Sequence, residues 1–227
     1  MSYFLRTKEI KLIKAVIFDM DGTIIDSEPL HFILEEKLFN SLGIYMDKEE
    51  HDKFIGTTSY YMWEILKNKY KLKEKIEDLV QKDRDEYYLT IFNNPDKIIE
   101  MEGAVSLIKE LYKKDLKLCL ASSSPINVIN IVLKNLKVEK MFSQVVTGDA
   151  VENSKPSPDI FLKSAELLEV LPEECIVFED SNNGVLAAKR AGMKCVGIDN
   201  CHSGSQDISS ADVIIKSFKN LNLKKIF

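Results

Sequence analysis

Residues 14–28 read KAVIFDMDGTIIDSE, and this stretch decides both the fold and the position of a candidate site. The apolar run at 15–18 ends at two carboxylates, Asp19 and Asp21, which one residue separates. Side chains two residues apart in a strand face the same way, so these carboxylates share one face if the strand geometry continues. Gly22 follows directly and permits backbone conformations that other residues avoid.

Two carboxylates at the end of a strand have more than one interpretation. They suit a general acid/base pair or a site for a hard metal ion such as Mg²⁺. They also suit a strand that simply ends in a solvated, aspartate-rich turn. The first stretch does not choose among these interpretations, so the rest of the chain must do so.

Three later segments favour the functional interpretations. Residues 117–125 read KLCLASSSP, residues 153–161 read NSKPSPDIF, and residues 175–184 read CIVFEDSNNG. Each places hydroxyls, a lysine or an acidic pair after an apolar strand or in a loop, where open α/β sheets build their sites. Together with the first carboxylates, these groups resemble a phosphoryl-transfer site with a divalent metal.

The pattern of apolar residues predicts an α/β fold with a doubly wound parallel sheet and a Rossmann-like core. Short connections between alternating helices and strands favour right-handed parallel crossovers. The predicted elements, in two groups, are strands at 15–18, 116–121, 144–147, 175–179, 194–198 and 212–215, and helices near 101–114, 126–136, 158–169 and 181–191.

Between the first and second strands nearly every pattern is helical. Pro29 suits the first turn of a helix, and leucines then recur at helical spacing. Asn93, Asn94 and Pro95 form a turn that predicts the return to the sheet. We therefore expect a small all-α cap at 29–94, inserted into a catalytic core made of residues 1–28 and 95–227.

With these motifs in order, the chain resembles the haloacid dehalogenase (HAD) superfamily, in the branch that carries a small helical cap. It is most similar to the sugar-phosphate phosphatases and β-phosphoglucomutase of that superfamily. The four motifs that carry the resemblance are Asp19-Met20-Asp21-Gly22-Thr23, Ser122, Lys155-Pro156 and Glu179-Asp180.

The resemblance implies an Mg²⁺-dependent phosphatase that acts on a small phosphate ester. Asp19 is then the nucleophile that forms an aspartyl phosphate, and Asp21 is the general acid and base. The expected Mg²⁺ ligands are Asp19, Asp21 through its backbone carbonyl, and Asp180, with Glu179 either sharing in ligation or orienting a water. Taken alone, the acidic pair at 179–180 also suits the N-terminus of a helix.

The same resemblance assigns phosphate contacts to Ser122, to the backbone near Ser123, and to Lys155. Two prolines flank the lysine and restrict its turn. A serine run can instead cap the following helix, and both roles are compatible because a helix N-terminus also binds anions.

In the cap, the candidates for substrate contacts are His31, which the resemblance supports, and the segment that contains Gly56, Thr57, Thr58 and Ser59. A lone histidine is more often a surface or packing residue, so both interpretations of His31 stay open. Three aromatic residues nearby, Tyr60, Tyr61 and Trp63, are expected in the core of the cap rather than against a sugar.

A phosphosugar mutase of the β-phosphoglucomutase type is the main alternative function. Such sequences carry cationic residues where this chain has Ser59 and Pro125, which favours the phosphatase. A phosphonate hydrolase would need a cap lysine, and Lys53 does not lie where the resemblance places one. A non-catalytic phosphosugar-binding protein would be expected to lack Asp19 or Asp21.

Composition excludes several classes of function. A net charge of −5 argues against a general nucleic-acid binder, which needs a positive surface. No apolar stretch approaches the roughly 20 residues of a membrane span, and none resembles a signal peptide. The four cysteines lack metal-site spacing and are expected as buried free thiols. We expect a cytoplasmic monomer that binds neither nucleic acid nor membrane.

Overall fold

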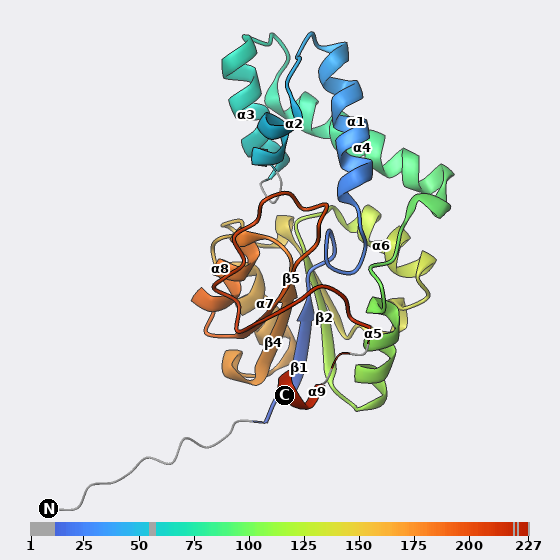
Figure 1. The fold of residues 1–227 in the computed structure, drawn as a ribbon, viewed down its shortest axis with the longest axis vertical. Coiled ribbons are helices and arrows are strands. Elements are labelled where there is room, and N and C mark those ends of the chain that lie inside the picture. The colour runs from blue at the N-terminus through green and yellow to red at the C-terminus, as the bar shows by residue number, and fades with distance from the viewer. Residues whose placement is uncertain (1–11, 55–57, 220, 222, 227) are drawn as a thin grey trace, which may run out of the picture.

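A computed structural model describes residues 12–54, 58–219, 221 and 223–226. Its centre is a six-stranded parallel sheet with the order β3-β2-β1-β4-β5-β6 (Figure 1). The strands are β1 (Ala15–Phe18), β2 (Lys117–Ser122), β3 (Gln144–Thr147), β4 (Cys175–Glu179), β5 (Lys194–Ile198) and β6 (Val213–Ile215). Every predicted strand is present, with bounds that differ by at most one residue.

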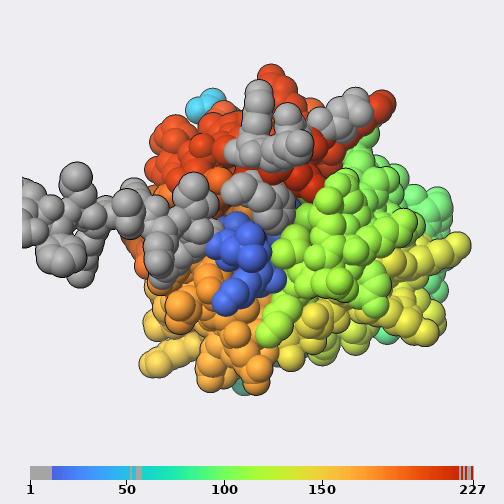
Figure 2. All heavy atoms as spheres, turned by 90° about the horizontal axis from the view of Figure 1, so that it is seen from below, coloured from blue at the N-terminus to red at the C-terminus, as the bar shows by residue number. Residues whose placement is uncertain are grey.

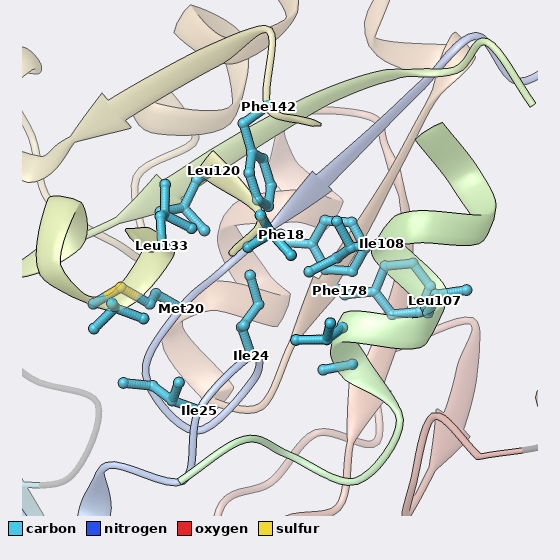
Figure 3. Close-up of a cluster of buried hydrophobic side chains, with 14 of the residues drawn as sticks. Phe18, Met20, Ile24, Ile25, Leu107, Ile108, Leu120, Leu133, Phe142 and Phe178 are labelled. Carbon is cyan, nitrogen blue, oxygen red and sulfur yellow. The ribbon is translucent and has the colours of Figure 1, made fainter. Parts of the chain in front are cut away.

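The first strand, β1, lies at the centre of the sheet between β2 and β4. All four of its side chains are therefore fully buried. Val16 and Phe18 pack into one layer of the core, whereas Ala15 and Ile17 pack into the other. The ring of Phe18 stacks on Phe178 of β4, with centroids 5.0 Å apart (Figure 3). Burial on both faces is the reason why this strand is continuously apolar rather than alternating.

Helices cover both faces of the sheet. On one face lie α5 (Ala104–Lys113) and α6 (Ile126–Asn135), and on the other lie α7 (Asp159–Leu168) and α8 (Asn182–Arg190). The predicted doubly wound, Rossmann-like architecture is therefore confirmed. The short elements that remain are the 3₁₀ turns η2 (Pro95–Lys97), η3 (Glu139–Met141), η4 (Gly148–Ala150) and η5 (Pro172–Glu174), and the helix α9 (Leu223–Ile226).

A helical insertion near the N-terminus stands over the carboxyl ends of the strands (Figure 1). It contains α1 (Glu28–Ser41), α2 (Lys48–His51), η1 (Asp52–Phe54), α3 (Ser59–Tyr70) and α4 (Ile76–Asn93). It has a hydrophobic cluster of its own, centred on Trp63, Leu66 and Phe39. The insertion itself was predicted, while the domain boundaries at 28/29 and 94/95 remain predictions.

Two of the three aromatic residues predicted in the cap core are not there. Trp63 is fully buried, but Tyr60 and Tyr61 are 49% and 53% exposed. Because α3 begins at Ser59, its rotation turns Met62, Trp63 and Leu66 inward and leaves the two tyrosines outside this cluster, where Tyr60 lines the cavity described below.

The chain enters and leaves the insertion through two segments that hydrogen-bond to each other. The backbone N–H of Asp26 donates to Ile99, and that of Met101 donates to Ile24, each at 2.9 Å. Between these bonds, Ile25 forms an antiparallel bridge with Glu100. The crossing between core and insertion is therefore a short two-stranded ribbon.

The end of the molecule opposite the insertion is seen from below in Figure 2, where α5 in green lies beside the first described residues in blue. Among the described residues, no helix is both long enough and apolar enough to cross a membrane. Cys119, Cys175 and Cys195 are buried free thiols as predicted, but Cys201 is exposed, because it lies in the loop that follows β5.

Candidate active site

A tight turn follows β1 and carries the two predicted catalytic carboxylates. The N–H of Asp19 donates to Phe178 of the neighbouring strand at 3.0 Å, so the sheet pairing continues into the turn. The carbonyl of Met20 accepts hydrogen bonds from the backbone N–H groups of Thr23, Ile24 and Ile25. Met20 and Ile24 point into the core, as Figure 3 shows, and fix the turn to the fold.

Gly22 brings this turn against Asp180. Its φ is +73°, which side chains other than glycine disfavour, and a Cβ placed there would lie 2.0 Å from Oδ2 of Asp180. Thr23 donates its hydroxyl to Oδ1 of the same carboxylate at 3.2 Å. The first and fourth motifs, distant in sequence, are therefore in direct contact.

Lys155 connects two of the buried carboxylates. Its Nζ lies 2.6 Å from Oδ1 of Asp19 and 2.7 Å from Oε1 of Glu179. The three side chains are 8%, 8% and 1% exposed, respectively, so this pair of salt bridges is shielded from bulk water. The Nζ also lies 5.2 Å from the centre of the Phe161 ring. Lys155 is thus held in one position before any ligand binds.

Glu179 is held from its other side by the start of α8. Its Oε2 accepts hydrogen bonds from the N–H of Ser181 at 2.7 Å and from the Ser181 hydroxyl at 3.0 Å. Gly184 leaves space for this carboxylate, because a Cβ there would lie 1.7 Å from Oε1. With both oxygens bonded to protein donors, Glu179 is better placed to orient Lys155 than to bind a ligand.

The loop after β5 contributes residues that the sequence analysis missed. Ser203 donates its hydroxyl to Oδ2 of Asp180 at 2.6 Å, and the amide of Asn200 donates to the carbonyl of Gly22 at 3.3 Å. His202 pairs with Asp26 at 2.7 Å. The position of this loop at the carboxyl end of a strand was the available signal.

The buried carboxyl groups at the carboxyl ends of the strands, called the floor of the site below, carry excess negative charge. Burial raises the pKa of Asp19 well above its usual range; Glu179 and Asp21 add to the rise, and Lys155 opposes it. Burial likewise raises the pKa of Asp180, and the charges of Glu179 and Asp19 add to that rise. The two neighbouring carboxylates also raise the pKa of Lys155 above its ordinary value, against the effect of its burial. Lys155 pairs with Asp19 and Glu179, so Asp180 adds a third carboxyl group without a lysine of its own.

Asp21 has different surroundings. Ser124 donates to its Oδ2 at 2.7 Å, Ser122 lies 3.4 Å from the same oxygen, and Nε2 of His31 lies 3.9 Å from Oδ1. Burial alone would raise the pKa of Asp21, but His31 and Ser124 lower it overall. Oδ1 is buried and accepts no hydrogen bond from the described residues. Ser124 was not predicted, although it is the third serine of its run.

His31 connects the insertion to this site. Its ring stacks on Tyr87 with centroids 4.1 Å apart and planes at 3°. Burial alone would lower its pKa, but Asp21, Glu28 and Glu35 raise it to about 9. The ring is therefore charged at neutral pH.

The serine run supplies a hydroxyl and an exposed backbone. Ser122 is fully buried, and its Oγ accepts from the N–H of Ser124 at 3.0 Å. Ser123 is exposed and lines the cavity described below. A Cβ at Gly148 would lie 3.3 Å from Cα of Ser123, so the two loops are close. Phosphate contacts of Ser122, Ser123 and Lys155 remain predictions.

A cavity of about 780 Å³ lies between the floor and the insertion. Asp19, Asp21 and Lys155 form part of its floor, and His31, Thr58 and Ser59 line it from the insertion. Gly56 and Thr57, which were also predicted to contact substrate, lie outside the described residues. The insertion adds further residues that the sequence analysis did not single out as site residues, including Glu28, Glu35, Asp83 and Tyr87.

The floor fits a divalent cation. Asp180 accepts one hydrogen bond on each oxygen, which leaves lone pairs free, and Gly22 places the turn after β1 against it. Burial and neighbouring carboxylates raise the pKa values of Asp19 and Asp180, so a cation bound there would stabilise both carboxylates. Among the described residues, no three Asp, Glu, His or Cys side chains form a ready ligand cluster. The expected set needs only two carboxylates beside a backbone carbonyl, so this does not exclude it.

Comparison with known proteins decides the family. The family model of the haloacid dehalogenase-like hydrolases matches residues 16–198, which include all four motifs. The chain belongs to this family. The predicted resemblance is therefore confirmed, and so is the expectation of an enzyme of the phosphatase or hydrolase kind.

Similar proteins share nearly the whole length of this HAD-like hydrolase. It is 35% identical over 181 residues to a phosphorylated carbohydrates phosphatase of Thermotoga maritima, covering 80% of this chain and 82% of that protein. It is 31% identical over 217 residues to β-phosphoglucomutase of Bacillus subtilis, covering 93% and 92%. A crystal structure of mutant CbbY from Rhodobacter sphaeroides with xylulose-1,5-bisphosphate has a TM-score of 0.82 and 26% identity, covering 95% and 99%.

Proposed function

We propose that this HAD-like enzyme is an Mg²⁺-dependent phosphatase that hydrolyses a small phosphorylated sugar through an aspartyl phosphate on Asp19. The observation that carries the proposal is the salt bridge of Lys155 to Asp19 at the floor of the cavity beneath the insertion. That contact fixes a carboxylate and a cation where a phosphoryl group must meet both. The similarity to a phosphatase of phosphorylated carbohydrates supports the sugar phosphate as substrate class.

In the first half-reaction, an oxygen of Asp19 attacks phosphorus, and the bond from phosphorus to the sugar oxygen breaks. Asp21 gives its proton to that leaving oxygen. The pKa of Asp21 is low in the free enzyme, but an incoming phosphate dianion is a like charge and raises it. The two-residue offset lets the carboxylates act on phosphorus from different directions.

In the second half-reaction, Asp21 accepts a proton from the water that attacks the aspartyl phosphate. The bond between phosphorus and Asp19 breaks, inorganic phosphate leaves, and Asp19 is restored. The lowered pKa of Asp21 favours the carboxylate form that this step requires. The serine and lysine donors hold the phosphoryl oxygens, and the insertion excludes water.

Asp19, Asp180 and the Asp21 carbonyl are the proposed Mg²⁺ ligands. When bound, the cation supplies positive charge that lets a carboxylate approach a phosphate dianion and that stabilises the charge developed in the transition state. Lys155 alone does not balance its two carboxylate partners, Asp19 and Glu179, together with the buried Asp180. Glu179 acts in this proposal by positioning Lys155.

A phosphosugar mutase is the alternative, supported by the similarity to β-phosphoglucomutase. A mutase must hold a second phosphate near the insertion. Ser59 and Pro125, which replace cations in the resembled mutases, both line the cavity here and bring no charge to it. Arg84 also lines the cavity, but its guanidinium lies 3.9 Å from Asp149. This charge distribution favours hydrolysis.

The deciding experiment measures free phosphate released from a panel of sugar and nucleotide monophosphates, with Mg²⁺ and with EDTA. The panel includes β-glucose 1-phosphate with a trace of glucose 1,6-bisphosphate and coupled detection of glucose 6-phosphate. Mg²⁺-dependent release of phosphate supports the proposal. Glucose 6-phosphate formed without free phosphate would identify a mutase, and no turnover of any ester would favour a binding protein.

A further inference from the structure

Three acidic side chains line the part of the cavity that the insertion forms, and two of them have no salt-bridge partner among the described residues. Glu28 lies at the start of α1, Glu35 lies about two turns further along the same helix, and Asp83 lies on α4. Glu35 pairs with His51. Within the described part of the chain, Glu28 and Asp83 form no salt bridge.

Burial makes this negative charge unfavourable in the empty cavity. Asp83 is 8% exposed, and burial together with the charge of Glu35 raises its pKa to about 6, although the charge of His31 opposes the rise. Burial together with the charges of Asp21 and Glu35 raises the pKa of Glu28 to about 7, again against the charge of His31. Ser59, the neutral neighbour of Asp83, offers a hydrogen bond but no charge. A cation in the cavity would stabilise both carboxylates.

The basic side chains of the cavity lie elsewhere or are already engaged. Lys155 bridges Asp19 and Glu179 at the floor. Lys48 is exposed, and Arg84 lies beside the exposed carboxylate of Asp149. The charge of His31 lowers the pKa of both Glu28 and Asp83, but the salt-bridge partner of His31 is Asp21. The roof of the cavity therefore remains acidic.

We propose that Asp83 and Glu28 select a substrate whose leaving group carries a protonated amine and no second anion, such as an amino-sugar monophosphate. This inference rests on the proposed function and specifies its substrate. With the phosphate on the floor, the leaving group faces the acidic roof. An ammonium group supplies both donors and charge to carboxylates, whereas a hydroxyl supplies only a donor. A second phosphate there is repelled.

The test compares kcat/KM for matched esters that differ in one group. Glucosamine 6-phosphate is compared with glucose 6-phosphate, glucosamine 1-phosphate with glucose 1-phosphate, and both pairs with glucose 1,6-bisphosphate. We expect at least one amine-bearing ester to be preferred by about tenfold over its hydroxyl counterpart, since charged hydrogen bonds exceed neutral ones by that order. The bisphosphate should be the poorest substrate.

The variant Asp83→Asn should remove most of the amine preference, chiefly by raising KM for the amine-bearing ester. Asp85→Asn is the matched control, because Asp85 is an exposed carboxylate on the same helix whose partner is Gln81. It should keep the wild-type preference. Glu28→Gln repeats the test from another helix, so the inference stays testable if Asp83→Asn does not fold.

Equal efficiency toward amine and hydroxyl esters in the wild type would overturn the inference. So would an amine preference that survives in both Asp83→Asn and Glu28→Gln. p-Nitrophenyl phosphate, whose leaving group has no amine, tests the phosphatase activity without the amine preference. If it and the sugar phosphates all release no phosphate, the proposed phosphatase itself is wrong.

Discussion

The Nζ atom of Lys155 lies 2.6 Å from Oδ1 of Asp19, and both side chains are buried. The contact joins residues 136 positions apart in sequence. It orients the proposed nucleophile without any ligand and keeps a positive charge beside the point of attack. Such a buried contact has consequences for stability as well as for turnover.

Replacing the lysine should therefore destabilise the protein. Lys155→Met leaves Asp19 and Glu179 buried without their cation, and removing one partner of a buried pair costs about 3–5 kcal/mol. Urea denaturation would measure the loss in the free energy of unfolding. Lys163→Met is a control, because its contact with Glu166 is exposed. Equal stability of both variants would contradict a structural role for the buried pair.

Asp19→Asn should abolish activity without destabilising the protein, in contrast to Lys155→Met. It removes the nucleophile, so kcat should fall on the order of a thousandfold or more. It also removes one of several crowded carboxylates whose pKa burial raises, so the metal-free variant should be at least as stable as the wild type. Phosphate release and thermal melting check the two statements. Turnover at the wild-type rate would rule out Asp19 as nucleophile.

His31→Gln should change the pH dependence of stability. Because the pKa of His31 rises from 6.5 to about 9 in the fold, its stabilisation is complete below about pH 6.5 and disappears as pH rises through about 9. The variant should lose stability mainly below pH 9. Its acidic limb of kcat/KM should also move to higher pH, since His31 no longer lowers the pKa of Asp21. Parallel stability curves for both proteins across pH 6–10 would contradict this.

Gly22→Ala should disrupt the site far more than a matched glycine substitution does elsewhere. Gly22 and Gly43 have similar positive φ values, +73° and +72°, so backbone strain of about 1–2 kcal/mol applies to both. A Cβ at Gly43 contacts nothing, whereas one at Gly22 meets Asp180. Activity should thus be retained in Gly43→Ala and lost in Gly22→Ala. The two variants would have comparable activity if the contact with Asp180 were unimportant.

Mg²⁺ should stabilise the wild type by binding at the floor. At a hundredfold excess over its dissociation constant, a ligand adds about 2.7 kcal/mol to the free energy of unfolding. Asp180→Asn should abolish this gain, and Asp149→Asn, which alters an exposed carboxylate near the cavity mouth, should keep it. Thermal melts with Mg²⁺ and with EDTA measure the difference. A gain that persists in Asp180→Asn would place the metal elsewhere.

The strands and their terminal motifs could be predicted from the sequence because each depends on local pattern. The run at 15–18 is apolar because it is buried on both faces, and the turn after it needs Gly22. The contacts that organise the floor could not be predicted in the same way. Ser203 and Asn200 reach Asp180 and Gly22 only because β5 lies beside β4. That adjacency is a property of sheet order rather than of spacing.

The insertion was harder to predict than the sheet. Helical periodicity identified its helices, but it could not say which face of α3 is inside, and Tyr60 and Tyr61 were placed wrongly. Asp83 and Glu35 are ordinary acidic residues of amphipathic helices in the sequence. They become part of the cavity only when α1 and α4 lie side by side over the floor.

The hydrogen-bonded ribbon at Ile25 and Glu100 also has a mechanical meaning. Both connections of the insertion pass through it, so any rotation of the insertion as a body would have to bend it. His31 belongs to α1 of the insertion, whereas Asp21 belongs to the turn after β1. Such a rotation would therefore separate this charge pair and weaken the effect of His31 on the pKa of Asp21. The pKa of Asp21 is in this way coupled to the position of the insertion over the sheet.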